Sequence, residues 1–180
     1  VGMPLAAPSA NASETVSPTS AEHVLATLDG RIDAVIDAGP AEQGLESTII
    51  ALRQGGGWSL LREGPVTRDT LRAVLGEEEA ASGEIEAPGQ LARHYAPGKP
   101  VRLGASNAQA GEFLIGFGAV VGDVTLSPSG DLQEAARNLY ACLHLAKASP
   151  KPRVAVAPVP EDGVGRAIND RLRRAAAPAT

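Results

Sequence analysis

From residue 99 onward, short apolar runs alternate with longer segments of helical periodicity, and this alternation constrains the fold more than any other feature. The expected strands are 101–103, 113–117, 123–126 and 154–157. The expected helices are 129–148 and 165–177. Strands that alternate with helices form parallel sheets with right-handed crossovers. The sequence therefore predicts a parallel α/β domain over residues 99–180.

Both helices expected in this region are amphipathic. In the longer one, apolar residues recur every three or four positions, at Leu132, Ala136, Leu139, Leu143 and Ala146. In the final helix, Ile168 and Leu172 are expected to point inward. Four arginines of that helix are expected to lie largely outward, as a solvated face or, less commonly, as a weak RNA contact: Arg166, Arg171, Arg173 and Arg174.

Residues 1–76 predict a more fragmentary set of elements. A helix is expected between Thr19, which can act as its N-cap, and Gly30. The remaining expected elements are a strand at 33–37, a hairpin of strands at 47–53 and 58–62, and a helix capped by Thr67 that ends at Leu75. These strands are too few for a stable sheet. We expect them to complete a mixed, twisted α/β sheet whose other strands lie upstream of Val1.

Residues 77–98 differ in character and lack helical or strand periodicity. They begin with three glutamates and continue with Ala, Ser, Gly and Pro, a composition typical of an extended linker. The segment ends with Arg93-His94-Tyr95-Ala96-Pro97, which concentrates polar donors and an aromatic ring in five residues. We therefore expect a first part at 1–76, a linker or lid at 77–98, and the α/β domain at 99–180.

Charge and cysteine content exclude several classes of protein. The net charge of −5 argues against tight nonspecific binding of nucleic acid, although residues 99–180 carry ten basic and seven acidic side chains. Cys142 is the only cysteine, which excludes an internal disulfide, and its apolar helical setting predicts a buried thiol. No apolar run approaches the roughly 20 residues that cross a membrane. We expect a cytoplasmic protein with no membrane partner and no protein-held metal.

A loop rich in small hydroxyl and amide side chains runs through residues 5–19 and leads directly into the first expected helix. It contains no lysine or arginine. The unpaired N–H groups at a helix N-terminus can bind an anion, and short hydroxyl side chains can add hydrogen bonds. An ordinary capped loop has the same composition. Both interpretations stay open on the local sequence alone.

Five short motifs, in order and with compatible spacing, give a more specific indication. They are Pro8-Ser9-Ala10-Asn11, Ser17-Pro18-Thr19, Gly44-Leu45-Glu46-Ser47-Thr48, Arg62-Glu63-Gly64 and Arg93-His94-Tyr95-Ala96-Pro97. Together they resemble the YrdC-like family of threonylcarbamoyl-AMP synthases in its two-domain form. The resemblance implies the C-terminal part of a YrdC-like catalytic domain, then a linker, then a small Rossmann-like parallel α/β domain.

The resemblance also implies a nucleotidyltransferase reaction, in which L-threonine, bicarbonate and ATP give threonylcarbamoyl-AMP and pyrophosphate for threonylcarbamoyladenosine modification of tRNA. The implied partners are these substrates, Mg²⁺, and the downstream tRNA-modifying transferase machinery. The residues implied for ATP are Ala7, Ser9, Asn11, Ser17, Arg62 and Tyr95. The residues implied for threonine are Ser9 and Ser47. Tyr95 would reach back from the linker as a lid, with Arg93 and His94 as secondary candidates.

Each of these residues also has an ordinary structural interpretation. A local turn would account for Ser9 and Asn11. The opening of a strand would account for Ser47, a solvated hairpin position for Arg62, and an aromatic plug between domains for Tyr95.

Two other functions of the chain also stay open. It could be a noncatalytic RNA-binding module or a regulatory interaction domain.

The sequence departs from the family pattern near the hydroxyl-rich loop. Glu14-Thr15-Val16 occupies places where members of the family often have Gly and Pro, and the charge of Glu14 predicts weaker ATP binding. The lysine and arginine residues that the family uses on the triphosphate would lie upstream of Val1. We therefore expect the isolated chain to bind ATP weakly and to make little or no adenylate.

Overall fold

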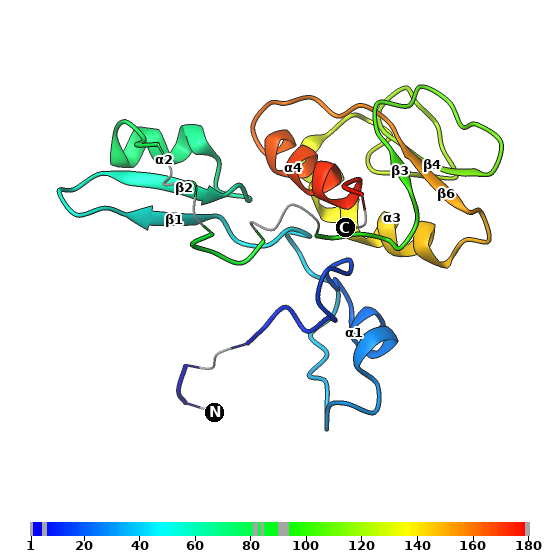
Figure 1. The fold of residues 1–180 in the computed structure, drawn as a ribbon, viewed down its shortest axis with the longest axis horizontal. Helices are drawn as coiled ribbons and strands as arrows, with labels where there is room; N and C mark the ends of the chain where they lie inside the picture. The colour runs from blue at the N-terminus through cyan, green and yellow to red at the C-terminus, as the bar shows by residue number, and fades with distance from the viewer. Residues whose placement is uncertain (1, 5–6, 81–82, 84, 90–93, 179–180) are drawn as a thin grey trace.

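The computed structural model describes residues 2–4, 7–80, 83, 85–89 and 94–178 (Figure 1). In chain order, its elements are α1 (Ala21–Leu28), β1 (Ile49–Leu52), β2 (Trp58–Arg62), α2 (Arg68–Leu75), β3 (Val101–Arg102), β4 (Glu112–Gly116), β5 (Val124–Thr125), α3 (Leu132–Ala148), β6 (Arg153–Val156) and α4 (Gly165–Ala175). Figure 1 shows the β1–β2 hairpin with α2 on one side, the parallel-sheet unit with α3 and α4 on the other, and α1 below. No helix in these ranges is long and apolar enough to cross a membrane.

The parallel sheet predicted for the last part of the chain is present. Its strand order is β3-β6-β4-β5, and every neighbouring pair is parallel. All residues of β4 are buried, because α3 and α4 cover one face of the sheet and loops cover the other. A strand covered on both faces consists of a continuous apolar run, which is why the run at 113–117 predicts it correctly.

Helix α3 packs its apolar stripe on this sheet and against α4. It begins at Leu132, three residues later than expected, because the Asp131 side chain accepts a hydrogen bond from the Glu134 backbone N–H at 2.7 Å and caps the helix. Cys142 is buried, as predicted, and burial raises the pKa of its thiol to about 11. Four of the five positions expected to point inward are buried: Ala136, Leu139, Leu143 and Ala146.

Strands β1 and β2 form the predicted antiparallel hairpin around the glycine-rich turn at 54–57. Trp58 is buried, and its indole N–H donates to the Gly76 carbonyl at 3.2 Å, just after α2 ends. Helix α2 has the predicted cap, because the Thr67 side chain accepts from the Thr70 backbone N–H. Trp58 therefore ties α2 to the hairpin.

Two expectations near the first helix are wrong. The segment 33–37 is not a strand, and Ile36 is 91% exposed. A strand needs a neighbour to complete its hydrogen-bond ladder, and no strand of the described ranges pairs with this segment. Thr19 is not the N-cap of α1: the Ser20 side chain accepts from the His23 backbone N–H, while the Thr19 N–H donates to His23 Nδ1.

The expectation that the arginines of α4 point outward is wrong at Arg171, whose side chain is fully buried. Arg171 lies three residues after Ile168 and four before Ala175, so helical spacing puts it on the same inward stripe as these two residues. Its charge is met by one carboxylate from its own helix and one from the first part of the chain. A paired charge can therefore occupy a position that spacing assigns to the core.

The ion pair at the start of β4 leads to a prediction about acid stability. The Arg102 guanidinium donates to both oxygens of the buried Glu112 carboxylate, at 2.9 and 2.6 Å. Hydrogen bonds from Arg102 and from the Gln109 backbone lower the pKa of Glu112 from 4.5 to about 2. A carboxylate whose pKa is lowered by folding stabilises the protein above its ordinary pKa, and this contribution is lost as the pH falls toward the lowered value.

We therefore expect the free energy of unfolding, measured by urea titration at about pH 6 and about pH 3, to fall more in the wild-type chain than in Glu112→Gln. The amide cannot titrate, so the variant is less stable at the higher pH and changes less on acidification. Glu161→Gln is the matched control, because the Glu161 side chain is 58% exposed. Equal losses in the wild type and Glu112→Gln would contradict the prediction.

Candidate functional site

Six of the seven residues that the sequence implicates in substrate binding line one cavity. They are Ala7, Ser9, Ser17, Ser47, Arg62 and Tyr95. The cavity has a volume of about 350 Å³ and also has Glu46 and His94 in its wall, and small-molecule sites commonly have volumes of this order. Asn11 is outside its lining, and Arg93 lies outside the described residues. Residues far apart in the sequence are therefore brought to one place.

Arg62 and Ser47 are in direct contact in this cavity. Arg62 Nε donates to the Ser47 carbonyl at 3.0 Å, and Arg62 Nη2 donates to Ser47 Oγ at 3.2 Å. Arg62 Nη1 reaches the Pro88 carbonyl of the linker at 3.4 Å. The guanidinium thus bridges the end of β2, the segment before β1 and the linker, and it is not a freely solvated hairpin arginine.

The N-terminal loop has an unusual backbone. Ala10 and Glu14 have positive φ angles of 53° and 65°, a conformation that favours glycine. Asn11 Nδ2 donates to the carbonyls of Ala12 and Thr15 at 3.1 and 3.3 Å, so a local turn accounts for its amide group. Asn11 Oδ1 is buried and has no hydrogen-bond partner in the described part of the chain. Asn11 therefore shapes the loop.

Tyr95 enters the cavity wall from the linker in a strained conformation. Its φ of 61° is rare for an aromatic residue and costs about 1–3 kcal/mol. The ring is stacked on Tyr140, with centroids 5.5 Å apart, and the Arg171 guanidinium lies 5.5 Å from its centroid. The next residue, Ala96, donates its N–H to the Glu14 carbonyl at 3.0 Å. Tyr95 is both a plug between the parts of the chain and a wall of the cavity.

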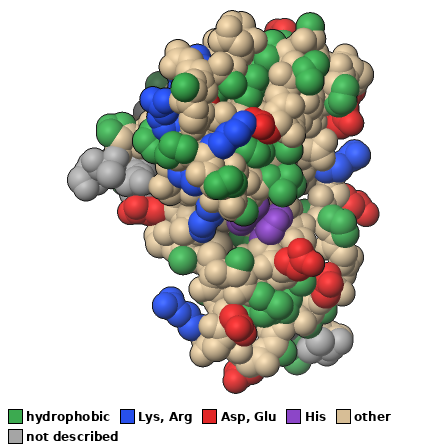
Figure 2. All heavy atoms as spheres, turned by 90° about the vertical axis from the view of Figure 1, so that its right-hand side faces the viewer, with side chains coloured by type: hydrophobic (Ala, Val, Ile, Leu, Met, Phe, Trp, Pro, Cys, Tyr) green, Lys and Arg blue, Asp and Glu red, His purple; other side chains and the backbone are tan. Residues whose placement is uncertain are grey.

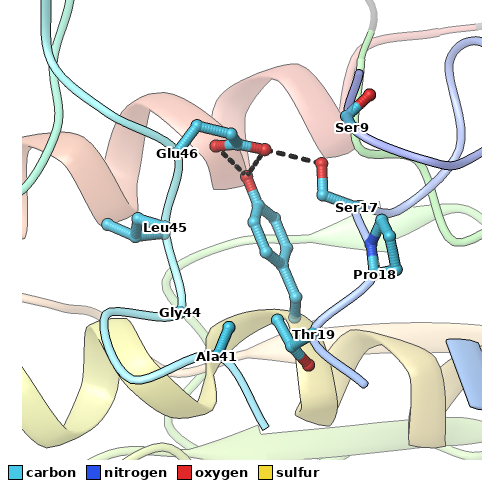
Figure 3. A pocket seen from close by; sticks show the side chains of 9 residues that line it. Ser9, Ser17, Pro18, Thr19, Ala41, Gly44, Leu45 and Glu46 are labelled. Atoms are coloured by element: carbon cyan, nitrogen blue, oxygen red, sulfur yellow. Dashed lines mark hydrogen bonds between the residues drawn. The ribbon is translucent and has the colours of Figure 1, made fainter. Parts of the chain in front are cut away.

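Glu46 is a site residue that the sequence analysis leaves without a role. Its carboxylate accepts a hydrogen bond from Ser17 Oγ at 2.5 Å (Figure 3). It also accepts from the Tyr140 hydroxyl at 2.8 Å and from Arg171 Nε at 3.3 Å. Burial alone would raise the pKa of Glu46. The hydrogen bond from Ser17, the charge of Arg171 and the hydrogen bond from Tyr140 together outweigh burial, so the pKa of Glu46 is below its ordinary value. Its place in the motif Gly44-Leu45-Glu46-Ser47-Thr48 is the signal that could have identified it.

A smaller cavity of about 130 Å³ adjoins the first, and Figure 3 looks into it. Gly44, in its wall, has a φ of 69°, and a Cβ there would come within 2.4 Å of the Arg137 Cα on α3. Only glycine lets this segment approach α3 so closely, and the approach brings Glu46 to Tyr140. Three residues line both cavities: Ser9, Ser17 and Glu46.

Two histidines without a predicted role join α1 to α3 beside this site. The His23 and His144 rings are stacked, with centroids 3.7 Å apart, and His144 Nε2 donates to the Ser17 carbonyl at 3.1 Å. Burial lowers the pKa of His144 to about 4, so its ring is neutral at pH 7. Figure 2 shows a face on which histidine side chains lie among apolar ones, with acidic side chains gathered below them.

The residues present do not fit a protein-held metal. Among the residues that the structure describes, no group of three or more His, Cys, Asp or Glu side chains could hold an ion. Glu46, the carboxylate in the cavity wall, already accepts hydrogen bonds from three side chains. The hydrogen-bond donors of the site are hydroxyl groups, backbone groups, the His94 ring and the Arg62 guanidinium, and such groups suit anionic and polar organic ligands.

Two family models match the chain. The model described as the C-terminal domain of threonylcarbamoyl-AMP synthase matches residues 66–177. The model described as telomere recombination matches residues 1–64. The two matches meet between β2 and α2, whereas the sequence analysis ends the first part at residue 76, and that division stays a prediction.

Curated relatives named threonylcarbamoyl-AMP synthase cover nearly the whole chain. The protein from Bacillus subtilis (strain 168) is 33% identical over 200 residues, which is 97% of this chain and 58% of the relative. The protein from Pyrococcus abyssi (strain GE5 / Orsay) is 34% identical over 198 residues, which is 96% of this chain and 57% of the relative. The chain thus spans somewhat more than half the length of these relatives.

The fold is similar to the crystal structure of P. abyssi Sua5 complexed with L-threonine. The TM-score is 0.79 at 30% sequence identity, over 94% of this chain and 56% of that chain. The same family is indicated by the mixed α/β fold with its parallel sheet, by the two family models and by the curated relatives. The chain therefore belongs to the Sua5/YrdC-like family of threonylcarbamoyl-AMP synthases.

Proposed function

We propose that this chain carries part of the active site of an L-threonylcarbamoyladenylate synthase, a nucleotidyltransferase. In this reaction the threonine amino group takes up the carbon of bicarbonate with loss of water. An oxygen of the resulting carbamate then attacks the α-phosphorus of ATP, and pyrophosphate leaves. The product, threonylcarbamoyl-AMP, supplies the transferase machinery that makes threonylcarbamoyladenosine in tRNA.

The observation that best supports this function is the contact between Arg62 and Ser47. The carbamate must lie beside the α-phosphate for in-line attack, so groups that bind threonine and groups that bind the nucleotide must be adjacent. The hydroxyl of Ser47 and the guanidinium of Arg62 are 3.2 Å apart on one cavity wall. The similar P. abyssi structure is described as a complex with L-threonine, which is consistent with threonine as a substrate.

The roles of the other residues follow from their chemistry. The planar guanidinium of Arg62 suits phosphate oxygens. Ser9, in the wall of both cavities, would contact threonine and ATP, and Ser17 would contact a phosphate. Ala7 would contribute its backbone alone, and Asn11 would act in substrate positioning through the turn that its amide group holds.

Tyr95 would cover the nucleotide from the linker and keep water out of the site. Exclusion of water matters here because a carbamate and a mixed anhydride both decompose in it. The strained backbone of Tyr95 supports this role, because such strain persists only where the surroundings hold the residue in place.

Mg²⁺ would enter as the magnesium complex of ATP. It keeps several waters and binds phosphate oxygens in such complexes, so the protein need not supply a dedicated set of ligands. A cytoplasmic location and a functional link to the tRNA-modifying machinery stay predictions of the sequence analysis.

An RNA-binding function of the basic α4 face is not favoured, because its arginines are paired with carboxylates. Arg173 pairs with Glu161 at 2.8 Å, and Arg166 pairs with Asp69 at 2.7 Å. Arg174 pairs with a carboxylate of its own helix.

Substitution of the cavity residues separates the proposed function from a regulatory interaction domain, because the function of such a domain would not depend on these residues.

Ser47→Ala tests the threonine end of the cavity. Loss of one hydroxyl removes one hydrogen bond to the substrate, so the Kd for L-threonine is expected to rise by up to about tenfold, measured by isothermal titration calorimetry. Ser106→Ala, at an exposed loop position, is the matched control and is expected to bind like the wild type. Unchanged threonine affinity in Ser47→Ala would contradict the role of Ser47.

Tyr95→Phe tests the lid. The variant keeps the ring that stacks on Tyr140 and removes the hydroxyl, so the thermal midpoint is expected to change little. The Kd for ATP is expected to rise by up to about tenfold, and more in Tyr95→Ala, which also removes the ring. A competition assay with a fluorescent ATP analogue measures both variants. ATP affinity equal to that of the wild type in Tyr95→Ala would refute the lid.

A further inference from the structure

The Glu46 carboxylate lies in the wall of both cavities, where Figure 3 shows it hydrogen-bonded to Ser17. It also joins the N-terminal loop to the parallel-sheet unit. Its Oε1 accepts from Ser17 Oγ at 2.5 Å, and its Oε2 accepts from Arg171 Nε at 3.3 Å. The Tyr140 hydroxyl lies 3.0 and 2.8 Å from the two oxygens. Because Tyr140 belongs to α3 and Arg171 to α4, two helices of the parallel-sheet unit hold a carboxylate that is adjacent in sequence to Ser47.

Arg171 is the buried centre of this contact. Its side chain is 0% exposed and pairs with the carboxylates of Asp170, at 3.0 Å, and Glu46. A buried cation is stable only when it is paired. The Tyr95 ring also lies against it, with the guanidinium carbon 5.5 Å from the ring centroid. Arg171 therefore contacts both the carboxylate that binds Ser17 and the tyrosine of the linker.

The Ser17 hydroxyl cannot donate to Glu46 and to a nucleotide at the same time. An ionised carboxylate only accepts hydrogen bonds, so Ser17 gives its single proton to Glu46. Donation to a phosphate oxygen requires the hydroxyl to turn away from Glu46. A partly buried carboxylate that loses a donor is destabilised unless other donors remain, and Tyr140 and Arg171 are those donors.

The backbone of Ser17 is held by the same unit, whereas its hydroxyl proton, now donated to Glu46, can be redirected by rotation about the Cβ–Oγ bond. His144 of α3 donates to the Ser17 carbonyl at 3.1 Å, and its ring is stacked on His23 of α1. The hydroxyl needs only a rotation about one bond to change partners. The parallel-sheet unit thus holds the position of Ser17 and leaves the direction of its proton adjustable.

We propose that Arg171 is a positioning residue for the adenylation reaction. It keeps the Glu46 charge compensated and hydrogen-bonded, so that Ser17 can exchange Glu46 for a nucleotide phosphate. The proposal rests on the proposed function and deepens it, because it makes the parallel-sheet unit part of the nucleotide site. Without Arg171, Glu46 retains Ser17 more tightly and repels the triphosphate.

Arg171→Met tests this role, because it keeps an unbranched apolar side chain and removes the charge. The Kd for ATP with Mg²⁺, measured by isothermal titration calorimetry, is expected to rise about tenfold or more, and the Kd for L-threonine is expected to rise less. Adding Glu46→Gln to Arg171→Met removes the uncompensated charge. The double variant is expected to bind ATP within about threefold of the wild type, a coupling that a double-mutant cycle isolates.

Two further variants make the test independent of folding defects. Arg173→Met on the same helix is the matched control, because the Arg173 side chain is 57% exposed and pairs with Glu161 at the surface. It is expected to bind ATP like the wild type. Thermal unfolding measurements show which variants are folded. If Arg171→Met does not fold, Tyr140→Phe replaces it as the test variant. Tyr140→Phe removes one donor to Glu46, keeps the ring stacked on Tyr95, and is expected to weaken ATP binding.

Unchanged ATP affinity in folded Arg171→Met, or in Tyr140→Phe where that variant is used, overturns the proposal. The proposal is also overturned if Arg171→Met loses ATP and threonine affinity equally and the added Glu46→Gln does not restore them. That result would indicate a general structural role for Arg171. A wild-type chain that binds neither ATP nor threonine overturns the proposed function and this inference with it. Binding by the wild type with insensitive variants overturns this inference alone.

Discussion

The geometry of the candidate site depends on the partly buried Glu46 carboxylate and the donors around it. Ser17 comes from the N-terminal loop, whereas Tyr140 and Arg171 come from two helices of the parallel-sheet unit. Breaking a buried ion pair costs about 3–5 kcal/mol, although the intact pair adds little net stability. Gly44 makes the contact possible, because a Cβ there would collide with the α3 backbone. The cluster therefore contributes mainly by fixing the arrangement of parts that are distant in sequence.

The parallel sheet is predictable from the sequence because its signals are local. A strand buried on both faces is a continuous apolar run, and an amphipathic helix repeats every three or four residues. The segment 33–37 carries a similar local signal but has no pairing strand in the described ranges, and pairing is decided by distant residues. At Arg171, residue type suggests the surface while helical spacing suggests the core, and the spacing is the better guide because carboxylates compensate the charge.

The composition of the cavity is predictable only through the family resemblance. Local chemistry gives Asn11 a turn, and the turn is present in the structure. The predicted hairpin brings Ser47 toward Arg62, but local chemistry gives no reason to place Tyr95 near either, because Tyr95 belongs to a segment far away in the chain. Neither local chemistry nor the family resemblance assigns a role to Glu46, because a lone carboxylate in a sequence is ordinarily a solvated side chain. Its importance follows from its partial burial and from Arg171 of the distant helix α4, which compensates its charge.

The most direct test of this account is a crystal structure of the chain with L-threonine and a nonhydrolysable ATP analogue. The account predicts threonine against Ser47, phosphate oxygens within hydrogen-bond distance of Arg62, and the Ser17 hydroxyl turned from Glu46 toward the nucleotide. Tyr95 is predicted to remain against the same cavity. Ligands bound elsewhere on the surface, or a Tyr95 ring turned away from a bound nucleotide, would contradict it.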